Sequence, residues 1–387
     1  MRSYPFRWPS PIDPPAWFVD LHEREPVGRV RLPSGDTAFL VSRHGDGLRV
    51  YTDPVFSRAA AHVPGAPRYA EAVVSDGSLL SFDPPEHTRL RRAVSGVFTA
   101  RRIAALRTGI ERVVDRLLDD AVAGGRSTDL VAALCEPLPI QLICQVLGVP
   151  HQDRVRFDAW AQVVLAARAA TGDERLAASR ELKAYLGELL AAKRTHPADD
   201  VLTDLAVGDL TEREAVTFAQ LLLVAGYGTT LNQLAITFFV LLRSPELFAA
   251  VHRDRATIPI AVEEIMRLHA CANGTFVRVA TADVEIAGVL VPAGSGVVVN
   301  AAAANRDPAV HPRPNELDLG RPATNHFTFG QGPHYCLGAP LARAEMQIAL
   351  GRVLERLPTL RLTVEPADVP WRQGQVAWGP ESLPVAW

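Results

Sequence analysis

The chain has 387 residues, of which 48% are hydrophobic, so it is too long for a small disulfide-held module and can bury a large core. A formal net charge of −3 and a pI near 6.4 argue against a nucleic-acid partner, because no overall basic surface is available to neutralise phosphates. The first residues are polar and interrupted by proline, so we expect neither a signal peptide nor a membrane anchor, and a cytoplasmic protein.

Residues 28–60 contain short alternating apolar runs joined by a Pro-Ser-Gly-Asp turn, which is typical of a small sheet. From 85 to 270 the pattern is helical almost throughout, and alternation returns at 277–300, where more β structure is expected. Residues 301–328 are rich in Asn, Asp, Pro and Arg, which predicts a coiled meander. A helix over 339–356 and a C-terminal hairpin complete the expected order.

No linker, charge block, low-complexity tract or internal repeat divides the sequence, so we expect one domain spanning residues 1–387, acting as a monomer. Its four cysteines lie far apart and lack the spacing of a disulfide framework or a zinc site. Cys135 and Cys144 fall in apolar helical sequence and are expected to be buried structural thiols.

One predicted helix is unusually long. Thr211 and Glu214 form a capping-box start, and no proline follows until Ser244-Pro245 ends the run. About 32 residues at 1.5 Å each reach roughly 48 Å, enough to cross the whole molecule. A membrane span is the alternative, but polar residues and glycines interrupt the middle, which favours a buried central helix. These interruptions are Gln220, Gly226, Gly228, Thr229, Thr230, Asn232 and Gln233.

Residues 329–338 read Phe-Gly-Gln-Gly-Pro-His-Tyr-Cys-Leu-Gly and surround Cys336 with groups suited to a metal-bound thiolate. Glycines allow turns that bring backbone N–H groups close to the sulfur, and a helix that begins near Gly338 stabilises an anion. Phe329 is placed to shield the sulfur from water. The alternatives are an inert cysteine in a glycine-rich loop, or a zinc site that lacks two further ligands beside His334 and Cys336.

This segment matches the haem-binding loop of the cytochrome P-450 family, Phe-Gly-x-Gly-x-His-x-Cys-x-Gly, at every fixed position. The resemblance covers almost the whole chain and is closest to the soluble bacterial members. It implies a mainly α fold with a smaller β-rich region, in which a long central helix lies over a buried haem. It also implies that Cys336 ligates the iron of haem b, and that electrons from NAD(P)H arrive through a ferredoxin-type donor and its reductase.

Other segments resemble the same family. Glu264-Ile265-Met266-Arg267 is similar to its Glu-x-x-Arg helix, whose ion pair joins a meander arginine, here Arg321. Residues 83–92 resemble the propionate-binding helix, in which His87 and Arg91 share a face one turn apart. By this comparison the other haem contacts are Arg278, His326, Phe329, His334 and Gly338. The arginines expected to face an acidic electron donor are Arg89, Arg92, Arg101, Arg102 and Arg343.

The catalytic segment departs from the family pattern. Residues 225–230, Ala-Gly-Tyr-Gly-Thr-Thr, resemble the oxygen-activating segment of the long helix, and Thr229 aligns with the threonine that hydrogen-bonds dioxygen, followed by Thr230. The preceding residue is usually Asp or Glu, which relays protons, whereas this chain has Gly228. Either ordinary hydroxylation, with water or substrate replacing the acid, or oxidative C–C or C–O coupling fits, and a bacterial natural-product tailoring step is expected.

Two other functions remain open from the sequence alone: a catalytically silent relative that acts as a helper or scaffold, and a haem-based binding protein. The retained cysteine and Thr229 favour the enzyme.

Positions facing a small-molecule substrate are assigned only by analogy with the family. They are Tyr227, Asn273, Phe276, Val376 and Trp378.

Overall fold

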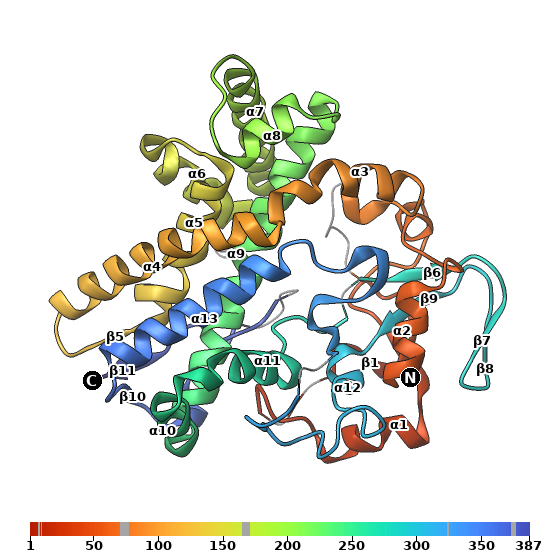
Figure 1. Cartoon of the computed structure of the whole chain (residues 1–387). Coiled ribbons are helices and arrows are strands. Elements are labelled where there is room, and N and C mark those ends of the chain that lie inside the picture. Colours follow the sequence, from red (N-terminus) through yellow and green to blue (C-terminus); the bar gives the residue numbers. More distant parts are fainter. Residues whose placement is uncertain are drawn as a thin grey trace.

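The computed structural model describes residues 1–6, 8, 10–69, 77–164, 171–274, 276–322, 325–372 and 377–387. Most helices gather on one side of the molecule and most strands on the other (Figure 1). The helices are α1 (Leu21–Arg24), α2 (His44–Thr52), α3 (Glu86–Val94), α4 (Ala100–Ala123), α5 (Pro137–Leu147), α6 (Arg154–Val164), α7 (Gly172–Thr195), α8 (Val201–Val207), α9 (Glu212–Leu242), α10 (Pro245–Arg253), α11 (Ile258–Leu268), α12 (Ala301–Ala304) and α13 (Ala339–Arg356).

The strands form a larger sheet and two smaller ones. Within the described residues the larger sheet has the order β1-β2-β3-β9-β6-β4, and the smaller sheets are β10-β11-β5 and the hairpin β7-β8. The strands are β1 (Arg2–Ser3), β2 (Val27–Arg31), β3 (Thr37–Val41), β4 (Phe56–Ser57), β5 (Ser127–Asp129), β6 (Arg278–Ala280), β7 (Val284–Ile286), β8 (Val289–Val291), β9 (Gly296–Val299), β10 (Arg361–Leu362) and β11 (Pro384–Ala386).

Strands from the two β-rich parts of the sequence combine in the larger sheet. β3 pairs in parallel with β9, with Val41 opposite Val299, and β6 lies antiparallel between β9 and β4. Every residue of β6 and β9 is buried, as expected for strands covered on both faces. This arrangement places Arg278, at the start of β6, inside the protein.

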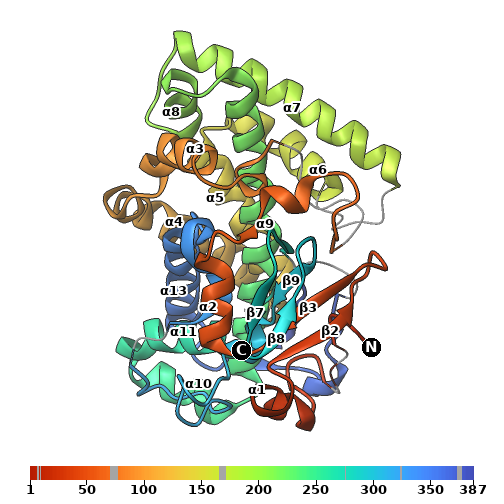
Figure 2. The same ribbon diagram turned by 90° about the vertical axis from the view of Figure 1, so that its right-hand side faces the viewer.

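The long helix α9 begins at its predicted cap. The Thr211 hydroxyl accepts from the Glu214 N–H at 3.3 Å, and the Glu214 carboxylate accepts from the Thr211 N–H at 2.8 Å. The helix has the length and hydropathy of a membrane span, but 67% of its most apolar window is buried inside the protein. Figure 2 shows α9 running through the middle of the molecule, with α4 and α13 on one side and the larger sheet on the other.

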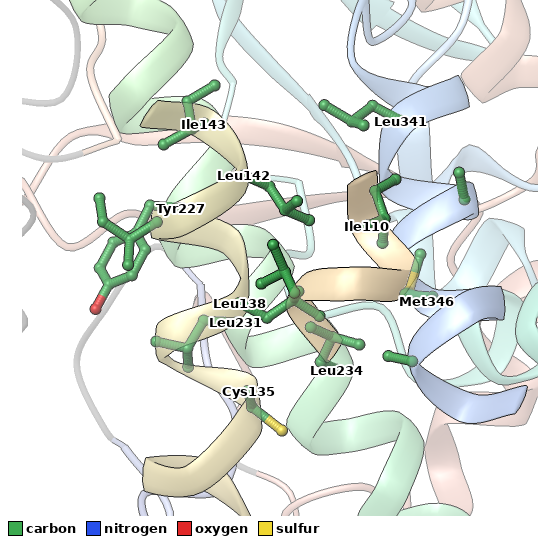
Figure 3. Close-up of a cluster of buried hydrophobic side chains, with 14 of the residues drawn as sticks. Ile110, Cys135, Leu138, Leu142, Ile143, Tyr227, Leu231, Leu234, Leu341 and Met346 are labelled. Carbon is green, nitrogen blue, oxygen red and sulfur yellow. The ribbon is translucent and has the colours of Figure 1, made fainter. Parts of the chain in front are cut away.

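The main core forms where α4, α5, α9 and α13 meet. Ile110 of α4, Leu138 of α5, Leu234 of α9 and Met346 of α13 are all nearly inaccessible and belong to one cluster (Figure 3). Cys135 and Cys144 are also buried, as predicted, and burial raises the pKa of the Cys135 thiol. These two cysteines therefore contribute to packing rather than to chemistry.

Glu345 of α13 is a buried acid whose Oε2 has no hydrogen-bond partner among the described residues. Burial raises its pKa to about 8, so the folded protein keeps it neutral while the unfolded chain ionises near 4.5. A raised folded pKa means that stability declines as pH rises through the window from 4.5 to 8.

Replacing Glu345 with glutamine should remove this pH dependence. Inside the window the free energy of unfolding of the wild type falls by about 1.4 kcal/mol per pH unit. Between pH 5 and pH 7 it should therefore fall by about 3 kcal/mol relative to that of the variant. Urea denaturation of the haem-free protein, followed by circular dichroism at both pH values, measures it. Parallel stability curves for the two proteins would contradict the assignment.

Candidate functional site

The loop before α13 is built from two tight turns, Phe327–Phe329 and Gly332–His334. Gly330 and Gly332 have φ of +67° and +70°, a region that only glycine adopts without strain. A β-carbon on Gly332 would also lie 2.5 Å from the carbonyl oxygen of Tyr51, so the loop sits directly against α2. The Cys336 N–H closes the loop by donating to the Phe329 carbonyl at 2.9 Å.

Cys336 is an exposed residue of the loop, and its surroundings shift the pKa of its thiol in opposing directions. Desolvation raises the pKa of its thiol. The N–H groups of Gly338 and Ala339, at the start of α13, and the positive charges of Arg91 and Arg343 all oppose this rise. Such donors and cations favour a thiolate, and a bound metal would displace the remaining proton.

Four of the predicted cofactor contacts meet in one cluster. The rings of His87, on α3, and His334, on the loop, are 4.2 Å apart between centroids. Arg278 is buried and donates to the Phe56 carbonyl at 3.2 Å, and Arg91 is half-buried one turn after His87. Arg58, which sequence reasoning missed, also belongs here, because it is buried and its charge acts on both Arg278 and His334.

The cluster contains three arginines, Arg58, Arg91 and Arg278, whereas the anion whose charge acts on Arg58, His87 and Arg278 is the single carboxylate of Asp83. Burial and the neighbouring His87 and Arg278 lower the pKa of His334 to about 2. In the described part of the chain, neither His334 ring nitrogen nor His87 Nε2 has a hydrogen-bond partner, and neither Arg91 nor Arg278 has an ion-pair partner. Buried polar groups of this kind require an acceptor, and the carboxylates of haem propionates fit them.

The predicted ion-pair triad is assembled as expected from the sequence. Glu264 receives two hydrogen bonds from Arg267, at 2.7 and 2.9 Å, and one from Arg321 at 2.9 Å. All three side chains are buried. The remaining N–H groups of Arg267 donate to meander carbonyls, including those of Asn305 and Pro314, so the triad fixes the chain that leads to the loop.

His326 is a correction to the sequence interpretation, which made it a propionate contact. Its Nε2 lies 3.0 Å from the Glu263 carboxylate, and its Nδ1 accepts from the Thr328 N–H at 3.3 Å. Both ring nitrogens therefore already have protein partners, and the structure does not bring His326 to the cluster around His334. Phe329 lies nearby, with the Arg343 guanidinium 4.5 Å from its ring centroid.

On α9, the Thr229 side chain is exposed and its hydroxyl donates to the Ala225 carbonyl at 2.6 Å. Thr230 is buried, so the structure does not place it beside Thr229 as a second accessible hydroxyl. A β-carbon on Gly228 would meet no atom within 4 Å, so the space for the usual acid is present while the acid is not. The Gly228 carbonyl accepts from the Asn232 amide at 2.8 Å.

Cys271 connects α9 with the loop. Its thiol donates to the Thr229 carbonyl at 3.4 Å, and the charge of Cys336 adds to burial in raising its pKa to about 12. A neutral thiol therefore contacts α9 and lies within range of the charge of Cys336. Sequence reasoning missed this role, because Cys271 belongs to no motif.

The residues expected to contact substrate are less well supported. Tyr227 is buried, with its hydroxyl 3.3 Å from Glu136, because its side of α9 packs on α5 (Figure 3). The side-chain oxygen of Asn273 accepts from the Ala302 N–H in the first turn of α12. Trp378 packs against Trp8 and Trp371. Of the five, Phe276 alone is largely exposed among those described, at 47%, and Val376 lies outside the described residues.

The arginines expected to face an electron donor are mostly paired within the protein. Arg89 pairs with Glu86 and Glu214, Arg102 with Asp199 and Asp204, and Arg343 with Glu263. Within the described chain, Arg92 and Arg101 are exposed and have no ion-pair partner. Of the five arginines expected to face the donor, Arg92 and Arg101 are therefore the two whose charge is not matched by an ion pair in the described chain.

The fold and this site together define a haem-thiolate oxidoreductase that oxidises small organic molecules. A family model described as cytochrome P450 matches residues 179–381. Nocardicin C N-oxygenase of Nocardia uniformis subsp. tsuyamanensis is 43% identical over 100% of this chain and 98% of its own length. The chain belongs to the cytochrome P450 family.

Solved structures agree over the full length. A mutant of the mixed-function P450 MycG in complex with mycinamicin IV matches with a TM-score of 0.94, 39% identity and complete coverage of both chains. Cytochrome P450mel 107F1, described as having biaryl coupling reactivity, matches with a TM-score of 0.90 and 38% identity over 97% of each chain. The mainly α fold and the use of haem, both predicted from the sequence, are confirmed.

Proposed function

We propose that Cys336, as the thiolate, binds the iron of haem b, and that His87, Arg91, Arg278 and His334 hold its propionates. The observation that carries this assignment is the buried, partly unpartnered cationic cluster beside the cysteine loop. Phe329 and Gly338 would flank the haem on the loop side. When bound, the haem supplies dioxygen activation, and a thiolate ligand favours cleavage of the O–O bond.

Thr229 acts as a hydrogen-bond acceptor in this proposal. Its hydroxyl proton is already directed to the Ala225 carbonyl, so the free lone pairs of Oγ1 can accept from a protonated group in the site. Gly228 offers no proton. The proton that the family usually takes from an acid must therefore come from water or from a substrate hydroxyl in the open space beside Gly228.

Gly228→Glu tests this account of proton supply. A β-carbon at position 228 meets no atom within 4 Å and glutamate suits a helix interior, so the variant should fold. We expect the ratio of product formed to NAD(P)H consumed to change by about tenfold, since positioned acids contribute 10²–10⁴-fold to proton transfer. Product and peroxide are measured against electron use. An unchanged ratio would show that residue 228 has no part in proton delivery.

The reaction best supported is monooxygenation of a small natural product, in line with the N-oxygenase that is 43% identical. Oxidative coupling is a second candidate, favoured by Gly228 and by the resemblance to a P450 with biaryl coupling reactivity. Reduction under carbon monoxide tests for thiolate ligation, and product analysis with an electron-donor system tests for turnover. A thiolate-type spectrum without turnover on any candidate would favour a silent helper or a haem-based binding protein.

The electron donor is proposed to be a ferredoxin-type protein served by its own reductase. Its contact would centre on Arg92 and Arg101, which have no internal ion-pair partner in the described chain. We further propose that residues 1–387 form one domain, which works as a monomer in the cytoplasm.

A further inference from the structure

Glu263 and Glu264 are neighbours on α11 that bind different parts of the chain. An α-helix turns about 100° per residue, so two successive side chains leave it in different directions. Glu264 binds Arg267 and the meander arginine Arg321. Glu263 binds Arg343, on α13, and His326, just before the cysteine loop. The second set was not anticipated from the sequence.

The contacts of Glu263 are close and numerous. Its Oε1 is 2.7 Å from Arg343 Nε, and its Oε2 is 2.9 Å from Arg343 Nη2, so the carboxylate faces the guanidinium side-on with two parallel hydrogen bonds. His326 Nε2 adds a third contact at 3.0 Å. Against the effect of burial, His326 and Arg343 lower the pKa of Glu263 to about 2. The carboxylate is therefore ionised at any neutral pH.

Arg343 in turn contacts both ends of the segment that carries Cys336. Its Nη1 donates to the Tyr335 hydroxyl at 3.0 Å, one residue before the cysteine. Its guanidinium lies 4.5 Å from the centroid of Phe329, whose carbonyl accepts from the Cys336 N–H. A planar guanidinium held on two edges can keep this position, whereas a lysine ammonium cannot.

We propose that Glu263 is a positioning residue for the thiolate: it fixes Arg343 over Phe329 and against Tyr335, and so sets the charge and the cover around Cys336. The proposal rests on the proposed function, because it requires Cys336 to be the iron ligand. It makes Glu263 and Arg343 a neutral pair beside the sulfur. Removing the carboxylate charge alone would leave one uncompensated positive charge near the iron.

The reduction potential of the iron separates this role from a merely structural one. Glu263→Gln should shift the midpoint potential to more positive values, by up to about 59 mV, which is a tenfold change for a one-electron couple. Glu263→Asp keeps the charge and should bring the potential back toward the wild-type value. The variant Glu263→Gln should also lose the thiolate-type band of the reduced, carbon monoxide-bound form faster on warming, because Phe329 and Tyr335 are less restrained.

Asp115 of α4 offers a matched control, because its partner lies on α13, the helix that carries Arg343. It binds Arg352 of α13 side-on at 2.7 and 2.8 Å, with exposures of 31% and 32% against 24% and 29% for Glu263 and Arg343. Asp115→Asn therefore breaks a similar pair away from the loop and should leave the potential unchanged. Circular dichroism of each haem-loaded variant establishes whether it is folded.

The proposal is overturned if Glu263→Gln keeps both the potential and the thermal persistence of the wild-type band, or if Asp115→Asn shifts them equally. A wild-type protein without a thiolate-type band would instead overturn the proposed function. If Glu263→Gln does not fold, the Glu263→Asp and Arg343→Lys variants decide. Wild-type thermal persistence of the thiolate-type band in Arg343→Lys, whose ammonium keeps the charge but cannot make the paired contact, would then count against the positioning role of Glu263.

Discussion

Replacing Cys336 with serine should abolish the thiolate-type spectrum and lower substrate oxidation by more than about a hundredfold. Changes to residues that merely support a metal ligand often cost 10–100-fold, and this change removes the ligand itself. The loop should still form, since its turns depend on Gly330, Gly332 and the Cys336 backbone N–H. The reduced, carbon monoxide-bound absorption spectrum and a product assay measure both effects.

Cys271 provides the matched control for that substitution. It lies close enough for the charge of Cys336 to act on it, yet its thiol donates to the helix carbonyl of Thr229. A serine hydroxyl can make the same hydrogen bond, so Cys271→Ser should keep the spectrum. A Cys336→Ser protein with the Soret band of its parent, or a Cys271→Ser protein without it, would refute the assignment of the ligand.

Loss of the triad carboxylate should have the second large effect, this time on folding. Glu264→Ala leaves Arg267 and Arg321 buried without their anion, and such breaks cost about 3–5 kcal/mol. That is a large part of the stability of an ordinary protein, so little folded, haem-loaded protein should be recovered. Haem content per chain and the urea midpoint of the recovered protein measure the loss.

The partly exposed pair between Asp115 and Arg352 again supplies the comparison. Partly exposed ion pairs contribute only about 0–1 kcal/mol, so Asp115→Ala should retain nearly all of the haem content. Equal losses of haem content and stability in Asp115→Ala and Glu264→Ala would mean that the buried triad stabilises the protein no more than a partly exposed ion pair does.

The sequence predicted those parts of the protein that depend on contiguous patterns. Capping, periodicity and the fixed residues of the loop predicted α9, the mainly α fold and the use of haem. The triad was also predicted, although Arg321 is 54 residues from Arg267 along the chain. The resemblance to the family joins the Glu-x-x-Arg helix to an arginine of the meander.

Partners brought together by tertiary packing could not be predicted in the same way. His326 lies ten residues before Cys336, and the family comparison suggested a role at the haem. In the structure α11 instead places the Glu263 carboxylate within hydrogen-bonding distance of His326 Nε2. Tyr227 belongs to the catalytic segment by sequence, yet the rotation of α9 turns it into the contact with α5. Arg58 was missed because it lies outside every motif, and only the sheet places it near Arg278.

The glycines of the cysteine loop have two different explanations. Gly330 and Gly332 are dictated by the polypeptide itself, through their dihedral angles and the proximity of α2. Gly338 has φ of −81° and nothing within 4 Å of where a side chain would begin, so the protein alone does not explain its smallness. We propose that this space accommodates the haem, so that cofactor binding, and not folding of the chain, requires a glycine at position 338.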